Sequence, residues 1–146
     1  MSEQVIQLTG YSKEELVHTG KGKVLIMDDE ALILDIAAEM LEVLGYEVTT
    51  ALDGIKALEE YKASMATKPY DFVILDLTVP GGMGGEETVN ILRELNPKIK
   101  ALVSSGYAND PIMAEYNRFG FHGVIPKPYT IENLSKALNK LKGATD

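Results

Sequence analysis

The chain has 146 residues, enough for one domain with a sizeable core and short for two. Its net charge of −8 argues against nucleic acid binding, because neutralising phosphates needs a basic face. The absence of cysteine excludes disulfides, thiol nucleophiles and thiolate metal sites. No apolar run is long enough for a membrane span, and the N-terminus lacks a signal-peptide pattern, so we expect a cytoplasmic protein without membrane contact.

Strands and helices are predicted to alternate from the first apolar run onward. Residues 23–27, KVLIM, are continuous and mostly apolar, which is typical of a strand buried on both faces. Apolar residues at helical spacing follow over 31–44, and Gly45 is expected to end that helix. The segment 46–51, rich in β-branched residues, is predicted to be the second strand.

The second helix is predicted to begin after Asp53, whose side chain can cap it. Ile55, Leu58 and Tyr61 are expected along its buried face. A third strand, again apolar throughout, is predicted over 71–76 and ends on an acid.

A glycine-rich loop, residues 77–85, separates the third strand from a helix predicted over 86–95. Asn96 and Pro97 are expected to end that helix. The fourth strand is predicted over 99–104.

The last third of the chain repeats the pattern. Asp110 and Pro111 are typical of an N-cap and first turn, which predicts a helix to about Phe119. A short fifth strand is expected within 122–128, and Thr130 can cap the final helix. The buried face of that helix is predicted to contain Leu134, Leu138 and Leu141.

This alternation predicts a (βα)₅ fold of the α/β class, with a parallel sheet and right-handed crossovers. Ligands of such sheets bind outside the carboxyl ends of the strands. The residues with useful chemistry all lie at or just beyond the ends of predicted strands and should therefore meet at that edge: Asp28, Asp29, Asp76, Ser104, Ser105 and Lys127.

Converging carboxylates need a cation, and oxygen is the only ligand type available at this edge, which favours Mg²⁺. The two histidines, His18 and His122, lie elsewhere in the predicted fold, so zinc or copper is not expected. A lysine and a serine hydroxyl can bind the oxygens of a phosphoryl group. A carboxylate beside the metal can attack phosphorus and form an acyl phosphate.

Each of these residues also has a purely structural interpretation. Asp28 and Asp29 could cap the helix at 31–44, and Asp76 could be a turn residue. Lys127 could be a solvated surface side chain, and Ser104 or Ser105 a satisfied core hydroxyl. Their convergence on one edge favours a functional site.

Four segments occur in the order and spacing of two-component response-regulator receiver domains, and the chain from about Gly22 to Leu141 resembles this CheY-like family. The segments are LIMDDE (25–30), DFVILDLTVPGGMGG (71–85), LVSSGYA (102–108) and VIPKPY (124–129). The resemblance implies a flavodoxin-like, doubly wound parallel sheet in the order 2-1-3-4-5.

The resemblance also implies a function. The domain would take a phosphoryl group from a histidine kinase and then switch conformation. It would not be an enzyme, although it would assist its own phosphorylation and dephosphorylation. Asp76 would be the phosphoacceptor, and Mg²⁺ would be bound by Asp28, Asp29, Asp76 and the backbone carbonyl of Thr78.

Four further positions acquire roles from the resemblance. Ser105 and Lys127 would bind the phosphoryl group, and Pro128 would follow a cis peptide bond. Val124 stands where the family usually has an aromatic switch residue. The loop after Asp76 is one residue longer than the common form, as in receivers attached to hybrid histidine kinases.

The predicted domain covers 23–142, followed by a tail at 143–146. Residues 1–22 have no place in this fold, although LTGYSKEEL (8–16) is similar to a stretch of PAS sensor domains. They are a remnant of an upstream module, an added helix or an artificial extension. With no output domain after Asp146, we expect a lone receiver or one cut from a larger kinase, as a monomer or weak dimer.

Two alternatives come from other functional classes. A Mg²⁺-dependent phosphatase of the haloacid dehalogenase type also uses a strand-end Asp, but it needs an acid where this chain has Thr78. A flavodoxin-like flavin binder needs a hydroxyl-rich phosphate loop after the first strand, where this chain has three acids.

Overall fold

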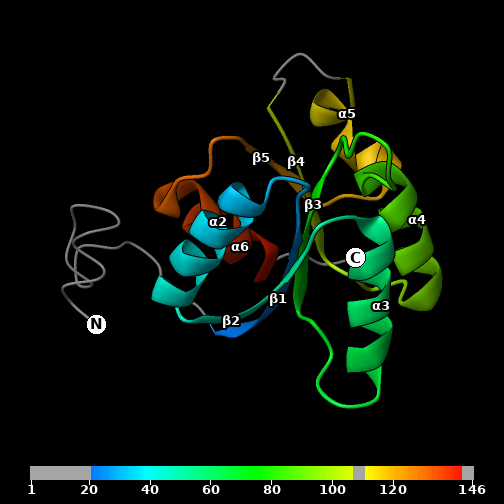
Figure 1. Cartoon of the computed structure of the whole chain (residues 1–146), viewed down its shortest axis with the longest axis horizontal. Helices are drawn as coiled ribbons and strands as arrows, with labels where there is room; N and C mark the ends of the chain where they lie inside the picture. The colour runs from blue at the N-terminus through cyan, green and yellow to red at the C-terminus, as the bar shows by residue number, and fades with distance from the viewer. Residues whose placement is uncertain (1–20, 107–110, 143–146) are drawn as a thin grey trace.

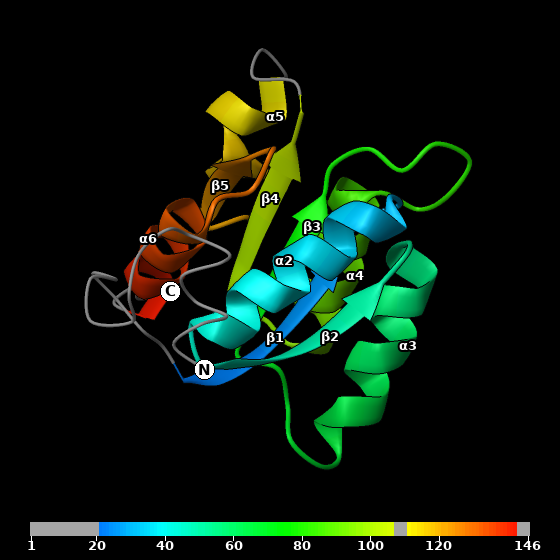
Figure 2. The same ribbon diagram turned by 60° about the vertical axis from the view of Figure 1, so that its left-hand side comes forward.

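The computed structural model describes residues 21–106 and 111–142. These residues form a parallel five-stranded sheet in the order β2-β1-β3-β4-β5, with helices on both faces (Figures 1 and 2). The predicted α/β fold and strand order are therefore confirmed. The strands are β1 (Gly22–Met27), β2 (Tyr46–Ala51), β3 (Phe72–Asp76), β4 (Ala101–Ser105) and β5 (Gly123–Pro126). The helices are α2 (Ala31–Val43), α3 (Gly54–Met65), α4 (Gly85–Leu95), α5 (Pro111–Ala114), the 3₁₀ helix η2 (Tyr116–Phe119) and α6 (Ile131–Lys142).

The apolar strands are buried on both faces because helices cover each side of the sheet (Figure 2). In β1, Val24 and Ile26 belong to the core shared with α2 and α6. Leu25 and Met27 belong to the opposite core, shared with α3 and α4. A strand buried in this way has no solvent face, which explains its unbroken apolar run.

Helix α3 has the predicted cap but not the predicted buried face. The Asp53 side chain accepts a hydrogen bond from the Lys56 N–H at 2.8 Å, so the capping prediction is confirmed. Leu58 and Tyr61 are buried, but Ile55 is 57% exposed, and its predicted burial is wrong. The reason lies at Gly54, which faces α4 so closely that a Cβ there would collide with the Thr88 side chain of α4. The helix face that packs on α4 therefore begins at Gly54, and its neighbour Ile55 points away.

The helix predicted from Asp110 to Phe119 is wrong in its length. Its proposed cap, Asp110, lies outside the described residues, and α5 ends after one turn at Ala114. Glu115 leaves helical geometry, with φ −119° and ψ 34°, and η2 then forms a separate 3₁₀ turn. Gly120 follows in the left-handed region at φ 96° and turns the chain toward β5. Residues three apart lie on one face of a 3₁₀ helix, so η2 packs both Tyr116 and Phe119 against the core beside α3 and α4.

The remaining elements agree with the predictions apart from small shifts of boundary. Strand β4 begins at Ala101, two residues later than expected. The Thr130 hydroxyl accepts a hydrogen bond from the Asn133 N–H at 3.0 Å, which confirms this cap of α6. The three leucines predicted for the buried face of α6 are all buried: Leu134, Leu138 and Leu141.

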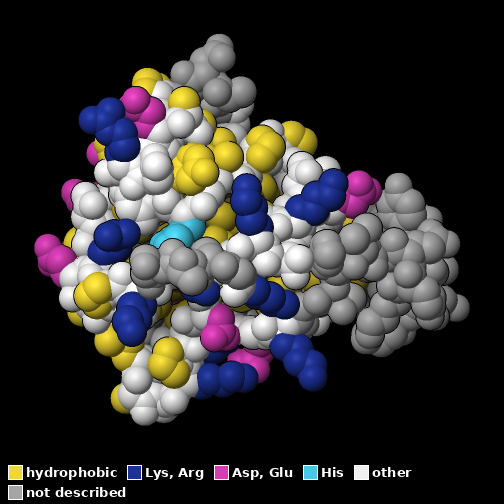
Figure 3. Space-filling model, turned by 180° about the vertical axis from the view of Figure 1, so that it is seen from behind, with side chains coloured by type: hydrophobic (Ala, Val, Ile, Leu, Met, Phe, Trp, Pro, Cys, Tyr) yellow, Lys and Arg dark blue, Asp and Glu magenta, His cyan; other side chains and the backbone are white. Residues whose placement is uncertain are grey.

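Strand β1 begins at Gly22, so the predicted N-terminal extension ends one residue earlier than expected. Most of that extension, residues 1–20, and the tail at 143–146 lie outside the described residues. Among the helices described, none is long and apolar enough to cross a membrane. Figure 3 shows basic and acidic side chains interspersed with apolar ones on one face of the molecule.

Candidate phosphoacceptor site

Strand β1 delivers three consecutive acids to the carboxyl edge of the sheet. Asp28 is fully buried, and its N–H donates to the Ala51 carbonyl at 3.0 Å, which extends the pairing of β1 with β2. Its Oδ1 accepts from the Glu30 N–H at 2.9 Å, and its Oδ2 accepts from Lys127 Nζ at 3.0 Å. Asp29 and Glu30 are exposed. The buried acid is thus held by the fold, while its two neighbours face solvent.

The capping interpretation of Asp28 and Asp29 is wrong. The N-cap residue of α2 is Glu30, and its side chain makes no capping hydrogen bond. Both aspartates lie before the cap, where the chain turns from β1 toward the helix.

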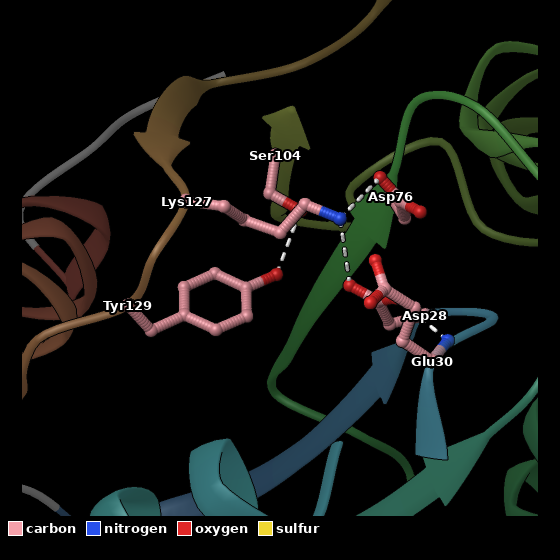
Figure 4. Close-up of polar contacts among 6 residues, drawn as sticks. All are labelled: Asp28, Glu30, Asp76, Ser104, Lys127 and Tyr129. Atoms are coloured by element: carbon pink, nitrogen blue, oxygen red, sulfur yellow. Dashed lines mark hydrogen bonds and ion pairs between the residues drawn. The ribbon is translucent and has the colours of Figure 1, made fainter. Parts of the chain in front are cut away.

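Asp76 is the last residue of β3 and is 3% exposed. Its Oδ1 lies 3.2 Å from Lys127 Nζ, so it faces Asp28 across the same ammonium group (Figure 4). The next helix begins close by, because a Cβ at Gly85 would lie 2.8 Å from the Asp76 carbonyl oxygen. Only glycine permits this approach of α4 to the end of β3.

Lys127 lies just beyond β5 and joins the two acids. Its ammonium contacts one carboxylate from β1's end and one from β3's end, and its side chain is 12% exposed. Its N–H donates to the Ser105 carbonyl at 3.2 Å, and its peptide bond to Pro128 is cis. The interpretation of Lys127 as a solvated surface lysine is therefore wrong.

The two serines at the end of β4 differ. Ser104 is fully buried and its Oγ accepts a hydrogen bond from the Tyr129 hydroxyl at 2.7 Å, so the core-hydroxyl interpretation is confirmed for Ser104. Ser105 lines an open depression of about 530 Å³ at the carboxyl edge. The depression is also lined by Asp29, Glu30, Asp76, Thr78 and Lys127.

The structure therefore brings together residues from the ends of four strands. Val124 does not join them: it is partly buried and packs against the core on the α3 and α4 side of the sheet. His122 is also remote, because its Nδ1 accepts from the N–H of Ala101 at the start of β4.

Burial and charge alter the ionisation of this cluster. Burial raises the pKa of Asp76 to about 7, and the charge of Asp28 adds to the rise, although Lys127 opposes it. Burial alone would lower the pKa of Lys127, but hydrogen bonds and charges from Asp28 and Asp76 outweigh it and raise this pKa. The cluster therefore holds more negative charge than one lysine balances, and a cation would favour the ionised form of Asp76.

The donor set fits a hard divalent cation. Carboxylate oxygens of Asp28, Asp29 and Glu30 all lie within 4.8 Å of one another. Glu30 was not among the predicted ligands, although its place directly after Asp28 and Asp29 could have suggested it. Tyr129 was also missed, and nothing in the sequence around it signals a hydrogen bond to Ser104.

The fold and the site define a doubly wound α/β domain with an acidic edge and a bridging lysine at the carboxyl ends of its strands. The sequence profile of the response regulator receiver domain family matches residues 24–139. The chain belongs to this family, and the prediction from the resemblance is confirmed over the phosphatase and flavin-binding alternatives. Receiver domains act as phosphoacceptors in phosphorelays and are regulatory rather than catalytic proteins.

Similar proteins include both short and long members of the family. The chain is 32% identical to the chemotaxis protein CheY of Thermotoga maritima over 120 residues, which is 82% of this chain and 96% of that protein. It is 30% identical to the sensor protein EvgS of Escherichia coli over 97% of this chain and 11% of EvgS. The chain thus spans a small part of its longer relatives. The crystal structure of the response regulator TrrA from Thermotoga maritima is similar, with 27% identity, a TM-score of 0.70, and coverage of 82% of this chain and 97% of that one.

Proposed function

We propose that Asp76 accepts a phosphoryl group from a histidine kinase. The observation that carries this proposal is the position of its carboxylate, which lines the open depression and lies 3.2 Å from the Lys127 ammonium. A carboxylate oxygen of Asp76 forms the new bond to phosphorus while the bond from phosphorus to the donor imidazole nitrogen breaks. A relative named as a histidine kinase, mak1 of Schizosaccharomyces pombe, supports this class of donor.

Mg²⁺ is the proposed cofactor, held by Asp28, Asp29, Asp76 and the backbone carbonyl of Thr78, with Glu30 close enough to contribute. Bound Mg²⁺ supplies positive charge that offsets the carboxylates and the phosphoryl oxygens. The all-oxygen donor set supports this choice, as does the Mg²⁺–beryllofluoride complex formed by TrrA.

Lys127 and Ser105 are the proposed phosphoryl-binding residues, since both line the depression beside Asp76. Lys127 already contacts Asp28 and Asp76, and its ammonium has a third N–H with which to bind a phosphoryl oxygen. Val124 occupies the proposed switch position, where this chain has no aromatic ring. The domain is also proposed to assist its own phosphorylation and dephosphorylation.

The proposal extends to the setting of the domain. We assign residues 23–142 to the receiver and expect it to act in the cytoplasm as a monomer or weak dimer. Its partner is a histidine kinase, and neither nucleic acid nor a membrane is an expected ligand of this domain.

Intact-mass measurement after incubation with acetyl phosphate and Mg²⁺ tests the proposal. The wild-type chain should gain one phosphoryl group, and Asp76→Asn should gain none. Asp71→Asn is the matched control, because Asp71 precedes the opposite end of β3 and accepts the Lys23 N–H at 2.8 Å. Labelling of Asp76→Asn to the wild-type extent would disprove the assignment.

A further inference from the structure

A buried hydrogen bond lies behind the bridging lysine. The Tyr129 hydroxyl donates to Ser104 Oγ at 2.7 Å, and the two residues are 7% and 0% exposed (Figure 4). Neither group contacts solvent appreciably, so the bond forms in a region of low effective dielectric, where an unpaired hydroxyl is costly.

This hydrogen bond joins the segment of Lys127 to the strand beside Asp76. Ser104 pairs with Asp76 in the register of β3 and β4, and its carbonyl accepts the Leu77 N–H at 2.9 Å. Tyr129 lies two residues beyond Lys127. The Tyr129 ring is therefore fixed directly to β4, the strand that pairs with β3 beside Asp76.

The segment needs such a contact because its backbone has few of its own. The pairing of β4 with β5 ends at Pro126, and the Lys127 N–H to the Ser105 carbonyl is the next backbone hydrogen bond. Pro128 has no N–H to donate. Figure 4 shows the Lys127 side chain reaching over to Asp28 and Asp76 from this segment, with the Tyr129 hydroxyl pointing toward Ser104.

We propose that Tyr129 is a positioning residue for Lys127. The Tyr129–Ser104 hydrogen bond fixes the backbone of Tyr129, which follows Pro128, and so limits the movement of Lys127. In this position the Lys127 ammonium contacts the carboxylates of Asp28 and Asp76 and can also bind a phosphoryl oxygen. A lysine side chain has several rotatable bonds, so ordering it against two carboxylates costs conformational entropy, and a backbone already held in place lowers that cost.

The effect on ligand binding rests on the proposed function and is tested with beryllofluoride, which stands in for the phosphoryl group. Calorimetric titration at saturating Mg²⁺ compares wild type, Tyr129→Phe, Lys127→Met and the double variant. Tyr129→Phe should weaken beryllofluoride binding about fivefold, the size of one neutral hydrogen bond. In the Lys127→Met background the same change should alter binding by less than about twofold, because its effect passes through Lys127. Equal effects in both backgrounds would overturn the proposal.

Two control variants separate positioning from a general loss of stability. Tyr61→Phe removes a comparable hydroxyl contact, since Tyr61 Oη accepts from Asn96 Nδ2 at 3.0 Å in the other core. It should lower the melting temperature without changing beryllofluoride affinity. Ser104→Ala removes the acceptor of the Tyr129 hydroxyl and should weaken binding at least as much as Tyr129→Phe. Unchanged affinity in Ser104→Ala would contradict the proposal.

A crystal structure of Tyr129→Phe tests the positioning without any ligand. We expect Lys127 Nζ to lose its contact with Asp28 or with Asp76. An ammonium that stays within 3.2 Å of both, as in wild type, would overturn the proposal even if the domain binds beryllofluoride. If wild type fails to bind beryllofluoride, the proposed function fails, and this structure still decides the positioning role.

Discussion

Lys127 Nζ lies 3.0 Å from Oδ2 of Asp28, a residue 99 positions earlier in the sequence. Asp28 is fully buried, so an ammonium at this distance provides the charge that makes its burial tolerable. The same ammonium contacts Asp76 at 3.2 Å. Lys127 therefore has a structural role in addition to its proposed contact with the phosphoryl group.

Replacing Lys127 with Met should destabilise the metal-free domain by about 2–4 kcal/mol, because Asp28 is left buried without its counter-charge. Urea unfolding in EDTA measures this loss. Mg²⁺ should restore part of it, since a cation bound to the folded state supplies charge at the same place. Lys136→Met, an exposed change on α6, is the control and should stay within about 0.5 kcal/mol of wild type. If Lys127→Met also lost no more than about 0.5 kcal/mol of unfolding free energy, the structural role of Lys127 would be contradicted.

Asp29→Asn should raise the melting temperature in EDTA by about 1–3 °C and reduce the further rise caused by Mg²⁺. Asp29 is exposed beside two other acids whose oxygens lie within 4.8 Å, so the change removes repulsion and one proposed metal ligand together. Thermal melts with EDTA and with Mg²⁺ measure both effects. Glu42→Gln changes an exposed acid near the C-terminal end of α2 and should leave the Mg²⁺ increment intact. A lower metal-free melting temperature with a full Mg²⁺ increment would instead indicate a structural role for Asp29.

The metal-free domain should lose stability as pH rises from about 4 to about 7, through the ionisation of Asp76. The pKa of Asp76 is about 7 in the folded state against an ordinary value of 3.8, so the folded state binds this proton more tightly than the unfolded state. Its contribution is fully present below the ordinary value and is lost as pH rises through the folded value. In EDTA, the melting temperature of Asp76→Asn should rise relative to that of wild type as pH increases across this range. A constant difference between the two proteins would contradict the shifted pKa.

Asp53→Ala should destabilise the domain by about 1 kcal/mol, because the first turn of α3 loses the acceptor of the Lys56 N–H. Asp53→Asn keeps an oxygen at the same place and should cost much less. Chemical denaturation of both variants distinguishes them. Equal losses would mean that the charge of Asp53 matters more than its capping hydrogen bond.

Much of the fold follows from patterns that are local in the sequence. The apolar run of β1, the caps at Asp53 and Thr130, and the leucines of α6 each depend on residues a few positions apart, and each was predictable. The failures at Ile55 and at Glu115 have a different origin. Ile55 is exposed because Gly54 packs on a distant helix, and the helix after Pro111 gives way to η2, which packs Tyr116 and Phe119 against the core.

The edge of the sheet that carries the site was also predictable, because parallel strands place their carboxyl ends together. The sequence by itself determined that Asp28, Asp29, Asp76, Ser105 and Lys127 meet there. It did not determine their burial or their ion pairs. Asp28 is buried while Asp29 is exposed, and the Lys127 ammonium contacts two carboxylates. Those features, like the hydrogen bond from Tyr129 to Ser104, depend on strand register and on side chains brought together from distant positions. Local patterns specify which elements form, whereas only their packing in three dimensions decides which side chains touch.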